Sequence, residues 1–306
     1  MRVSAALWSS PLLLIGISGF AHQRWEDFTL RTPIAPGETL IIGFQGGRDA
    51  WNNQKVGVGR MAAKLRKMTL PKTHVETVEN TKRELALRLV REALDRNRDG
   101  TLDESERRAA RIILYGESFG GAAVAKFARQ LQELDVPVLL TVQVDSVGIG
   151  DEVVPANVTA AANLYQRNGW IIHGPQEIRA QDPARTRILG SFGYDYSDSK
   201  IDISDLPWYK TILRHDHVKM DRDPLVWQRV EEFIVKAATA RCGPARCGRH
   251  QSILKAVSNP MLKILDPVGM LRFAQHDAIY PGCEIDGYSS TNVPTAPSSS
   301  RRSAPW

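Results

Sequence analysis

Residues 111–122 read Arg-Ile-Ile-Leu-Tyr-Gly-Glu-Ser-Phe-Gly-Gly-Ala, and this stretch decides the fold. Its first half, from Ile112 to Tyr115, is a short apolar run typical of a buried strand. The residues from Ala122 to Leu134 carry apolar side chains at helical spacing. The pattern Gly-x-Ser-x-Gly therefore stands at a turn from a strand to a helix, with Ser118 at its centre.

Ser118 is the candidate nucleophile. Glycines two positions before and after it permit a sharp turn, because neighbouring backbone leaves no room for a Cβ atom. Such a turn lifts the hydroxyl above the sheet edge. Here the chain resembles the α/β-hydrolase superfamily, in its lipase, esterase and thioesterase branches, over roughly residues 38–237. The resemblance implies an α/β-hydrolase three-layer sandwich and a Ser-His-acid triad.

Strands and helices alternate along the chain, which favours a mostly parallel central sheet with helices on both faces. Strands are expected at 39–44, 73–78, 112–115, 136–144, 170–173 and 187–189. Helices are expected at 59–68, 81–94, 122–134, 160–166 and 225–238. A polar, aromatic loop is expected at 190–199.

The candidate triad acid follows the most apolar predicted strand, 136–144. Asp145 comes directly after it, and the carboxyl ends of parallel strands meet at one edge, beside the nucleophile. The resemblance to the pancreatic-lipase-like branch also points to Asp145, whereas many other hydrolases carry the acid one strand later. Asp151 and Asp182 are therefore alternatives.

Two histidines, His215 and His217, precede the last predicted helix. A loop histidine that follows the serine and the acid in chain order fits an α/β-hydrolase triad. His217 is favoured as general base, because it lies nearer the helix and Val218 and Met220 could anchor its loop. His215 is the alternate, and His173 is a more distant one.

The candidate oxyanion hole combines two backbone amides. The predicted strand 39–44 runs into a glycine-rich turn that begins Gln45-Gly46. In α/β-hydrolases the loop after this strand and the residue after the nucleophile each supply one amide. The resemblance therefore nominates Phe119 together with Gln45 or Gly46.

Residues 95–106 match every position of the EF-hand pattern D-x-[DN]-x-[DN]-G-x5-E. A hard cation takes about six to eight oxygen ligands, and a coiled loop can wrap them around it. We therefore predict a structural Ca²⁺ site before the nucleophile strand, and no organic cofactor. The predicted ligands are Asp95, Asn97, Asp99, Thr101, Asp103 and Glu106.

Composition narrows the classes of partner. Of the net charge of +6 over 306 residues, most lies in 241–306, and no basic helix or aromatic-basic interleaving indicates a nucleic acid partner. The cysteines are Cys242, Cys247 and Cys283. Cys242, Cys247 and His250 have a spacing too irregular for a zinc site, and a fourth ligand is missing.

Three segments are expected. Residues 1–21 have an early arginine, an apolar stretch and small residues at their end, which predicts a cleaved secretory signal and export to the periplasm or medium. That stretch is too short for a permanent membrane span. Residues 22–240 form the hydrolase domain, and 241–306 read as a disordered tail.

The sequence thus predicts a serine hydrolase acting on an ester or thioester, with a small-molecule or lipid-like acyl substrate. Two alternatives stay open. One is a calcium-dependent binding or scaffold protein that keeps the hydrolase fold without turnover, and the other is an acyltransferase. The oligomeric state is not predicted.

Overall fold

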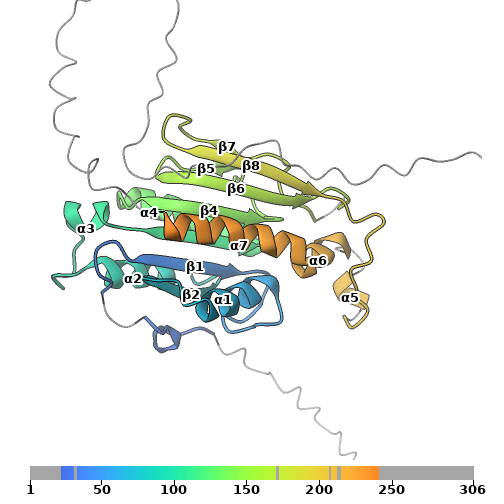
Figure 1. Cartoon of the computed structure of the whole chain (residues 1–306), viewed down its shortest axis with the longest axis horizontal. Helices are drawn as coiled ribbons and strands as arrows, with labels where there is room; N and C mark the ends of the chain where they lie inside the picture. Colours follow the sequence, from blue (N-terminus) through green and yellow to red (C-terminus); the bar gives the residue numbers. More distant parts are fainter. Residues whose placement is uncertain (1–21, 31–32, 170–171, 207, 212–214, 241–306) are drawn as a thin grey trace, which may run out of the picture.

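A six-stranded sheet, in the order β2-β1-β3-β4-β6-β8, forms the centre of the molecule (Figure 1). Every strand pair within it is parallel. The computed structural model describes residues 22–30, 33–169, 172–206, 208–211 and 215–240. The predicted signal and tail lie outside these residues, so export and disorder remain predictions.

The strands of the central sheet are β1 (Thr39–Gln45), β2 (Thr73–Glu79), β3 (Ile112–Glu117), β4 (Val138–Val144), β6 (Val158–Gln166) and β8 (Arg187–Tyr194). A separate two-stranded sheet joins β5 (Val153–Val154) and β7 (Arg179–Ala180). The helices are the 3₁₀ turn η1 (Trp25–Asp27), α1 (Gly57–Lys67), α2 (Arg83–Leu94), α3 (Glu104–Arg108), α4 (Phe119–Glu133), α5 (Trp208–Thr211), α6 (His215–Arg222) and α7 (Pro224–Thr239).

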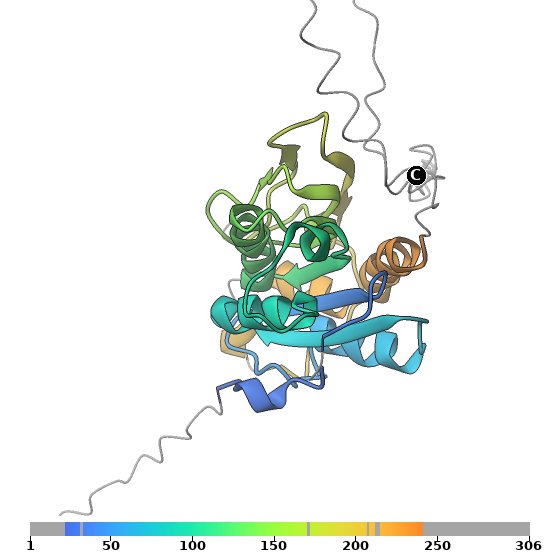
Figure 2. The same cartoon turned by 90° about the vertical axis from the view of Figure 1, so that its left-hand side faces the viewer.

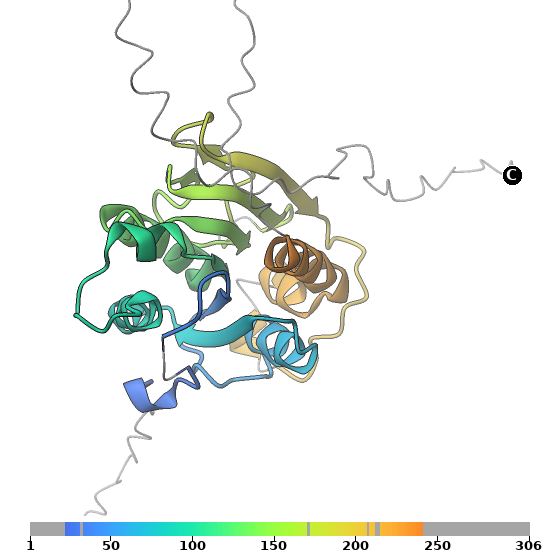
Figure 3. The same ribbon diagram turned by 60° about the vertical axis from the view of Figure 1, so that its left-hand side comes forward.

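Helices cover both faces of the sheet, as Figure 3 shows for α2 and α4 on one face and α1 and α7 on the other. Successive side chains of a strand point to opposite faces. In β1, Leu40 and Ile42 pack in the core under α2 and α4, whereas Ile41 packs in the core under α1 and α7. Burial on both faces explains why these strands read as continuous apolar runs. The predicted fold class, a three-layer α/β sandwich with a mostly parallel sheet, is confirmed.

The carboxyl ends of β1, β3 and β4 meet at one edge of the sheet. Phe44 of β1 pairs with Gly116 of β3, and Glu117 of β3 pairs with Val144 of β4. The residues that follow these strands are therefore neighbours. Figure 1 shows α5 and α6 at the same edge, towards which the strand arrows point, whereas Figure 2 views the opposite edge, near α3.

One predicted helix, 160–166, is wrong, because these residues belong to strand β6. β6 lies between β4 and β8, where Ala160, Ala161 and Ala162 are at most 2% exposed. Pairing with two neighbouring strands overrides the helix preference of alanine.

The last third of the chain needs three further corrections. Strand β8 continues to Tyr194, so the first half of the predicted loop 190–199 is strand. Ile172 and His173 are not strand, and the two residues before them lie outside the described part. The histidine pair lies on helix α6 and not on a loop.

Candidate active site

Ser118 occupies a strained turn between β3 and α4. Its backbone angles, φ 56° and ψ −126°, are in a region that residues other than glycine rarely adopt. The turn is held from two sides: the Ser118 amide donates to the Val144 carbonyl at 3.0 Å, and the Val147 amide donates to the Ser118 carbonyl at 3.0 Å. The nucleophile elbow is therefore fixed to the end of the neighbouring strand β4.

The glycines of the motif allow close backbone contacts. A Cβ atom at Gly120 would lie 2.1 Å from the carbonyl oxygen of Phe44, and one at Gly116 would lie 2.4 Å from the carbonyl oxygen of Gly120. Backbone atoms cannot move aside as a flexible side chain can. The spacing Gly-x-Ser-x-Gly thus follows from the packing of α4 against β1 and β3.

Asp145 and His217 lie in direct contact. Asp145 is fully buried, and its Oδ2 atom lies 2.6 Å from His217 Nδ1. Its Oδ1 atom accepts hydrogen bonds from the amides of Gly174 at 2.7 Å and Gln166 at 3.4 Å. These bonds fix the carboxylate, so it can orient the imidazole ring.

Helix α6 positions His217. Met220 is fully buried, and Lys219 Nζ donates to the Tyr196 carbonyl at 3.2 Å. The Asp221 carboxylate accepts the amide hydrogen of Gly57 at 2.7 Å. Contacts to α1 and to the segment after β8 therefore hold α6 over the sheet edge.

The second ring nitrogen of His217 faces another carboxylate. Nε2 lies 3.0 Å from Oε1 of Glu117, the last residue of β3. Among the described residues, the Ser118 hydroxyl has no hydrogen-bond partner. His217 thus lies between two carboxylates in this structure.

These contacts shift the pKa values of both groups. Burial raises the pKa of Glu117 to about 7, against the charge and hydrogen bond of His217, and the charges of Asp221 and Asp145 add to the rise. Burial lowers the pKa of His217, but the Glu117 charge and the hydrogen bonds to Asp145 and Glu117 outweigh it and raise this pKa to about 10. The raised pKa of His217 favours the doubly protonated imidazole.

The predicted oxyanion donors lie beside the nucleophile. Phe119 is the first residue of α4, where an amide has no partner within the helix. A Cβ atom at Gly46 would lie 3.4 Å from Ser118 Cβ. Gln45 lies one residue earlier, within the strand register. The placement therefore favours Gly46 over Gln45 as the second donor.

The alternates make other contacts. Asp151 Oδ2 accepts a hydrogen bond from the Ser146 hydroxyl, and Asp182 Oδ1 accepts the amide of Ala184 at 2.9 Å. The exposed His215 pairs with its half-buried neighbour Asp216 on α6, and His173 Nδ1 lies near the next carbonyl along the chain. The structure brings Ser118, Asp145 and His217 to one edge.

The sequence analysis missed two residues of this site, Glu117 and Gly174. Glu117 stands inside the serine motif at a predicted strand end, which was a usable signal. Gly174 reaches Asp145 from 29 residues away in sequence, and a Cβ atom on it would lie 2.8 Å from the Ser146 amide nitrogen. No local sequence pattern indicates such a contact.

The predicted calcium loop coils through Arg98 and Gly100, which have φ values of 60° and 83°. Asp95 Oδ2 accepts the Gly100 amide at 2.9 Å, and Asp99 Oδ1 accepts the Thr101 amide at 2.8 Å. Glu106, 2% exposed, accepts the Asp103 amide at 3.1 Å through Oε2. The described ranges contain no group of three or more His, Cys, Asp or Glu side chains gathered as a metal site.

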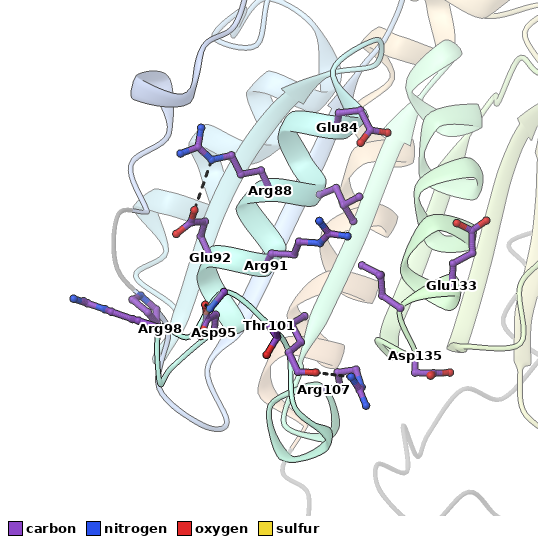
Figure 4. A pocket seen from close by; sticks show the side chains of 15 residues that line it. Glu84, Arg88, Arg91, Glu92, Asp95, Arg98, Thr101, Arg107, Glu133 and Asp135 are labelled. Atoms are coloured by element: carbon purple, nitrogen blue, oxygen red, sulfur yellow. Dashed lines mark hydrogen bonds and ion pairs between the residues drawn. The ribbon is translucent and has the colours of Figure 1, made fainter.

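A groove of about 1050 Å³ lies beside this loop, between α2 and the end of α4 (Figure 4). Its wall includes Arg91, Thr101 and Arg107, with Glu133 and Asp135 opposite. These segments precede β3 and β4, so the groove lies at the amino ends of the strands. It is therefore separate from the edge that carries Ser118.

Comparison with known sequences does not assign the chain to a family. No family model matches the chain. Gamma-glutamyl phosphate reductases of Thermotoga sp. (strain RQ2) and Thermotoga maritima are each 32% identical over 80 residues. That match covers 25% of this chain and 19% of the length of each reductase.

Two solved structures are similar in part. A cutinase-like protein from Cryptococcus sp. matches with a TM-score of 0.36 and 12% identity, over 68% of this chain and 98% of that one. An uncharacterized protein from Pseudomonas aeruginosa matches with a TM-score of 0.33 and 12% identity, over 68% of this chain and 51% of that one.

The topology of the chain itself defines its class. A parallel sheet covered by helices on both faces, with a serine on a sharp strand-to-helix turn, has the form of an α/β-hydrolase-type fold.

Among the described helices, none is long and apolar enough to cross a membrane.

Proposed function

We propose that the protein is a serine hydrolase that cleaves an ester or thioester through Ser118, His217 and Asp145. The observation that carries this proposal is the contact of 2.6 Å between Asp145 and His217, next to a strained serine elbow at the same sheet edge. A buried acid bound to a histidine, beside a serine held in a sharp turn, is the arrangement that nucleophilic acyl transfer requires.

Each residue has a role in the proposed reaction. His217 Nε2 takes the proton of the Ser118 hydroxyl as Oγ attacks the carbonyl carbon, and the amides of Phe119 and Gly46 bind the resulting oxyanion. Nε2 then returns the proton to the leaving oxygen or sulfur. Water, activated by the same nitrogen, releases the acid from Ser118.

The surface near Ser118 supports an apolar acyl substrate. Phe119, directly after the nucleophile, is 53% exposed, and Ile149, in the loop after β4, is 93% exposed. Acyl transfer to an alcohol would use the same triad. Product analysis with a competing alcohol separates the two reactions, because a transferase would yield the new ester.

A fluorophosphonate probe tests the proposal directly on the full-length protein. Such probes react with activated serines, and the tryptic peptide from Ile112 to Lys126 contains Ser118 as its one serine. We expect mass spectrometry to find the adduct on this peptide in native protein and not after heat denaturation. No adduct, or an adduct on another peptide, would overturn the proposal and favour a non-catalytic scaffold.

We also propose that the loop 95–106 binds Ca²⁺ as a structural ion. The donors available to it, Asp95, Asn97, Asp99, Thr101, Asp103 and Glu106, are all oxygen donors, which suit a hard cation. Leu102 packs against the core below, so an ordered loop would be tied to the start of β3. The ion would stabilise this connection and take no part in the acyl chemistry.

Removal of calcium is expected to lower the melting temperature. Saturation at about one hundred times Kd stabilises a folded protein by about 2.7 kcal/mol. Asp95→Asn should abolish the difference in melting temperature between Ca²⁺ and chelator, because the pattern requires aspartate at this first position, whereas the amide keeps the shape of the side chain and an acceptor for the Gly100 amide. Equal melting temperatures of the wild type in Ca²⁺ and in chelator would contradict the site, and Mg²⁺ serves as the control cation.

A further inference from the structure

Glu117 occupies the position that the Ser118 hydroxyl needs on His217. Its Oε1 atom lies 3.0 Å from Nε2, the nitrogen that must accept the Ser118 proton. Nδ1 already faces Asp145 at 2.6 Å. A ring with a carboxylate on each nitrogen donates two hydrogen bonds, so it has no lone pair for a proton from serine.

The same carboxylate lies beside the predicted oxyanion donor. A Cβ atom at Gly46 would lie 2.3 Å from Glu117 Oε2, so this oxygen fills the space next to the loop. A negative charge there would repel the oxyanion that forms on the substrate. The ionised form of Glu117 therefore opposes two steps of the proposed reaction.

Other charges around the ring do not replace Glu117. Asp221, on the same helix as His217, acts on the cluster through its charge. It lies 3.8 Å from Arg60 of α1, and Asp49 acts on it from the loop after β1. Among the described carboxylates, Asp145 and Glu117 are thus the two that contact the ring.

We infer that Glu117 is a positioning residue that holds His217 doubly protonated, and that the reaction begins when the Nε2 proton passes to water. This inference rests on the proposed function. The Nε2–H bond breaks, a water molecule takes the proton, and no further reactant is needed. The Glu117 side chain then turns aside, which leaves a lone pair on Nε2 for Ser118 and moves the charge away from Gly46.

Glu117→Gln tests this inference, because the amide has the shape of the carboxyl group without its charge. Activity requires neutral His217, so it rises as the pH increases through the histidine pKa. Loss of the Glu117 charge should lower the pKa of His217. The acid limb, which is the part of the pH profile where kcat/KM rises with pH, should therefore move to lower pH. We expect a shift of at least about one pH unit, hence about tenfold more activity below the limb.

A second variant separates the effect of direct contact with His217 Nε2 from the effect of a more distant negative charge. Asp221→Asn removes one negative charge without touching Nε2, so it should shift the limb less than Glu117→Gln. A merely structural role for Glu117 would lower activity equally at every pH. An unchanged limb in Glu117→Gln would overturn the inference.

A readout independent of turnover uses the ¹⁵N chemical shifts of His217 in the full-length protein at pH 7. We expect both ring nitrogens to be protonated in the wild type and one in Glu117→Gln. The shifts report on the ring even if Ser118 proves unreactive, so failure of the inference and failure of the proposed function remain distinguishable. Neutral His217 in the wild type would overturn the inference.

Discussion

Ser118→Ala is expected to lower kcat/KM for a simple ester by about 10⁶-fold, because removal of a triad nucleophile costs about this much. The stability of the fold should hardly change. The Ser118 hydroxyl makes no hydrogen bond to the described residues, and alanine adopts φ 56° with the same strain as serine. We therefore expect an unchanged melting temperature together with lost turnover, measured on the same purified protein.

Ser146→Ala is the matched control. Ser146 stands after β4, as Ser118 stands after β3, but its hydroxyl donates to Asp151. This variant should keep its activity and lose about 1–3 kcal/mol of stability, because a buried carboxylate oxygen is left without its partner. If instead Ser146→Ala lost turnover and Ser118→Ala kept it, the nucleophile assignment would be wrong.

The sheet was predictable where strands are apolar and glycine marks the turns. Ile112 to Tyr115 are buried, and so are Val138 to Val144 apart from the half-buried Leu139, and strands buried on both faces give continuous apolar runs. Ala160 to Ala162 escaped recognition, because their strand pairs with β4 and β8 through contacts distant in sequence. Local composition favours a helix there, and only the assembled sheet reverses that preference.

The site was predictable in its residue types and not in its contacts. Asp145 and Ser118 each follow a strand, so chain order and strand ends suffice to place them at one edge. The position of the His217 ring depends on how α6 packs against the sheet. The sequence predicts a loop where α6 lies, because its eight residues are mostly polar. The contact of Glu117 with His217 arises from that docking, so the motif alone could not reveal it.

The second large effect is expected for Asp145→Asn. The amide fits the same buried space, and its oxygen can still accept the Gly174 amide. Its NH₂ group, however, would face His217 Nδ1 and stabilise the tautomer with the proton on Nε2. That tautomer cannot accept the Ser118 proton, so kcat should fall by about 10⁴-fold. Steady-state kinetics with an ester substrate measure this loss.

The same substitution at the alternate acids gives the decisive comparison. Asp151→Asn and Asp182→Asn also remove one carboxylate each, but those groups bind Ser146 and the Ala184 amide. Both variants should retain kcat within about threefold, since they leave the imidazole tautomer unchanged. A loss of turnover in Asp151→Asn, with Asp145→Asn active, would show that the acid lies in the loop after β4, and that the buried contact of Asp145 serves only to hold α6 on the sheet.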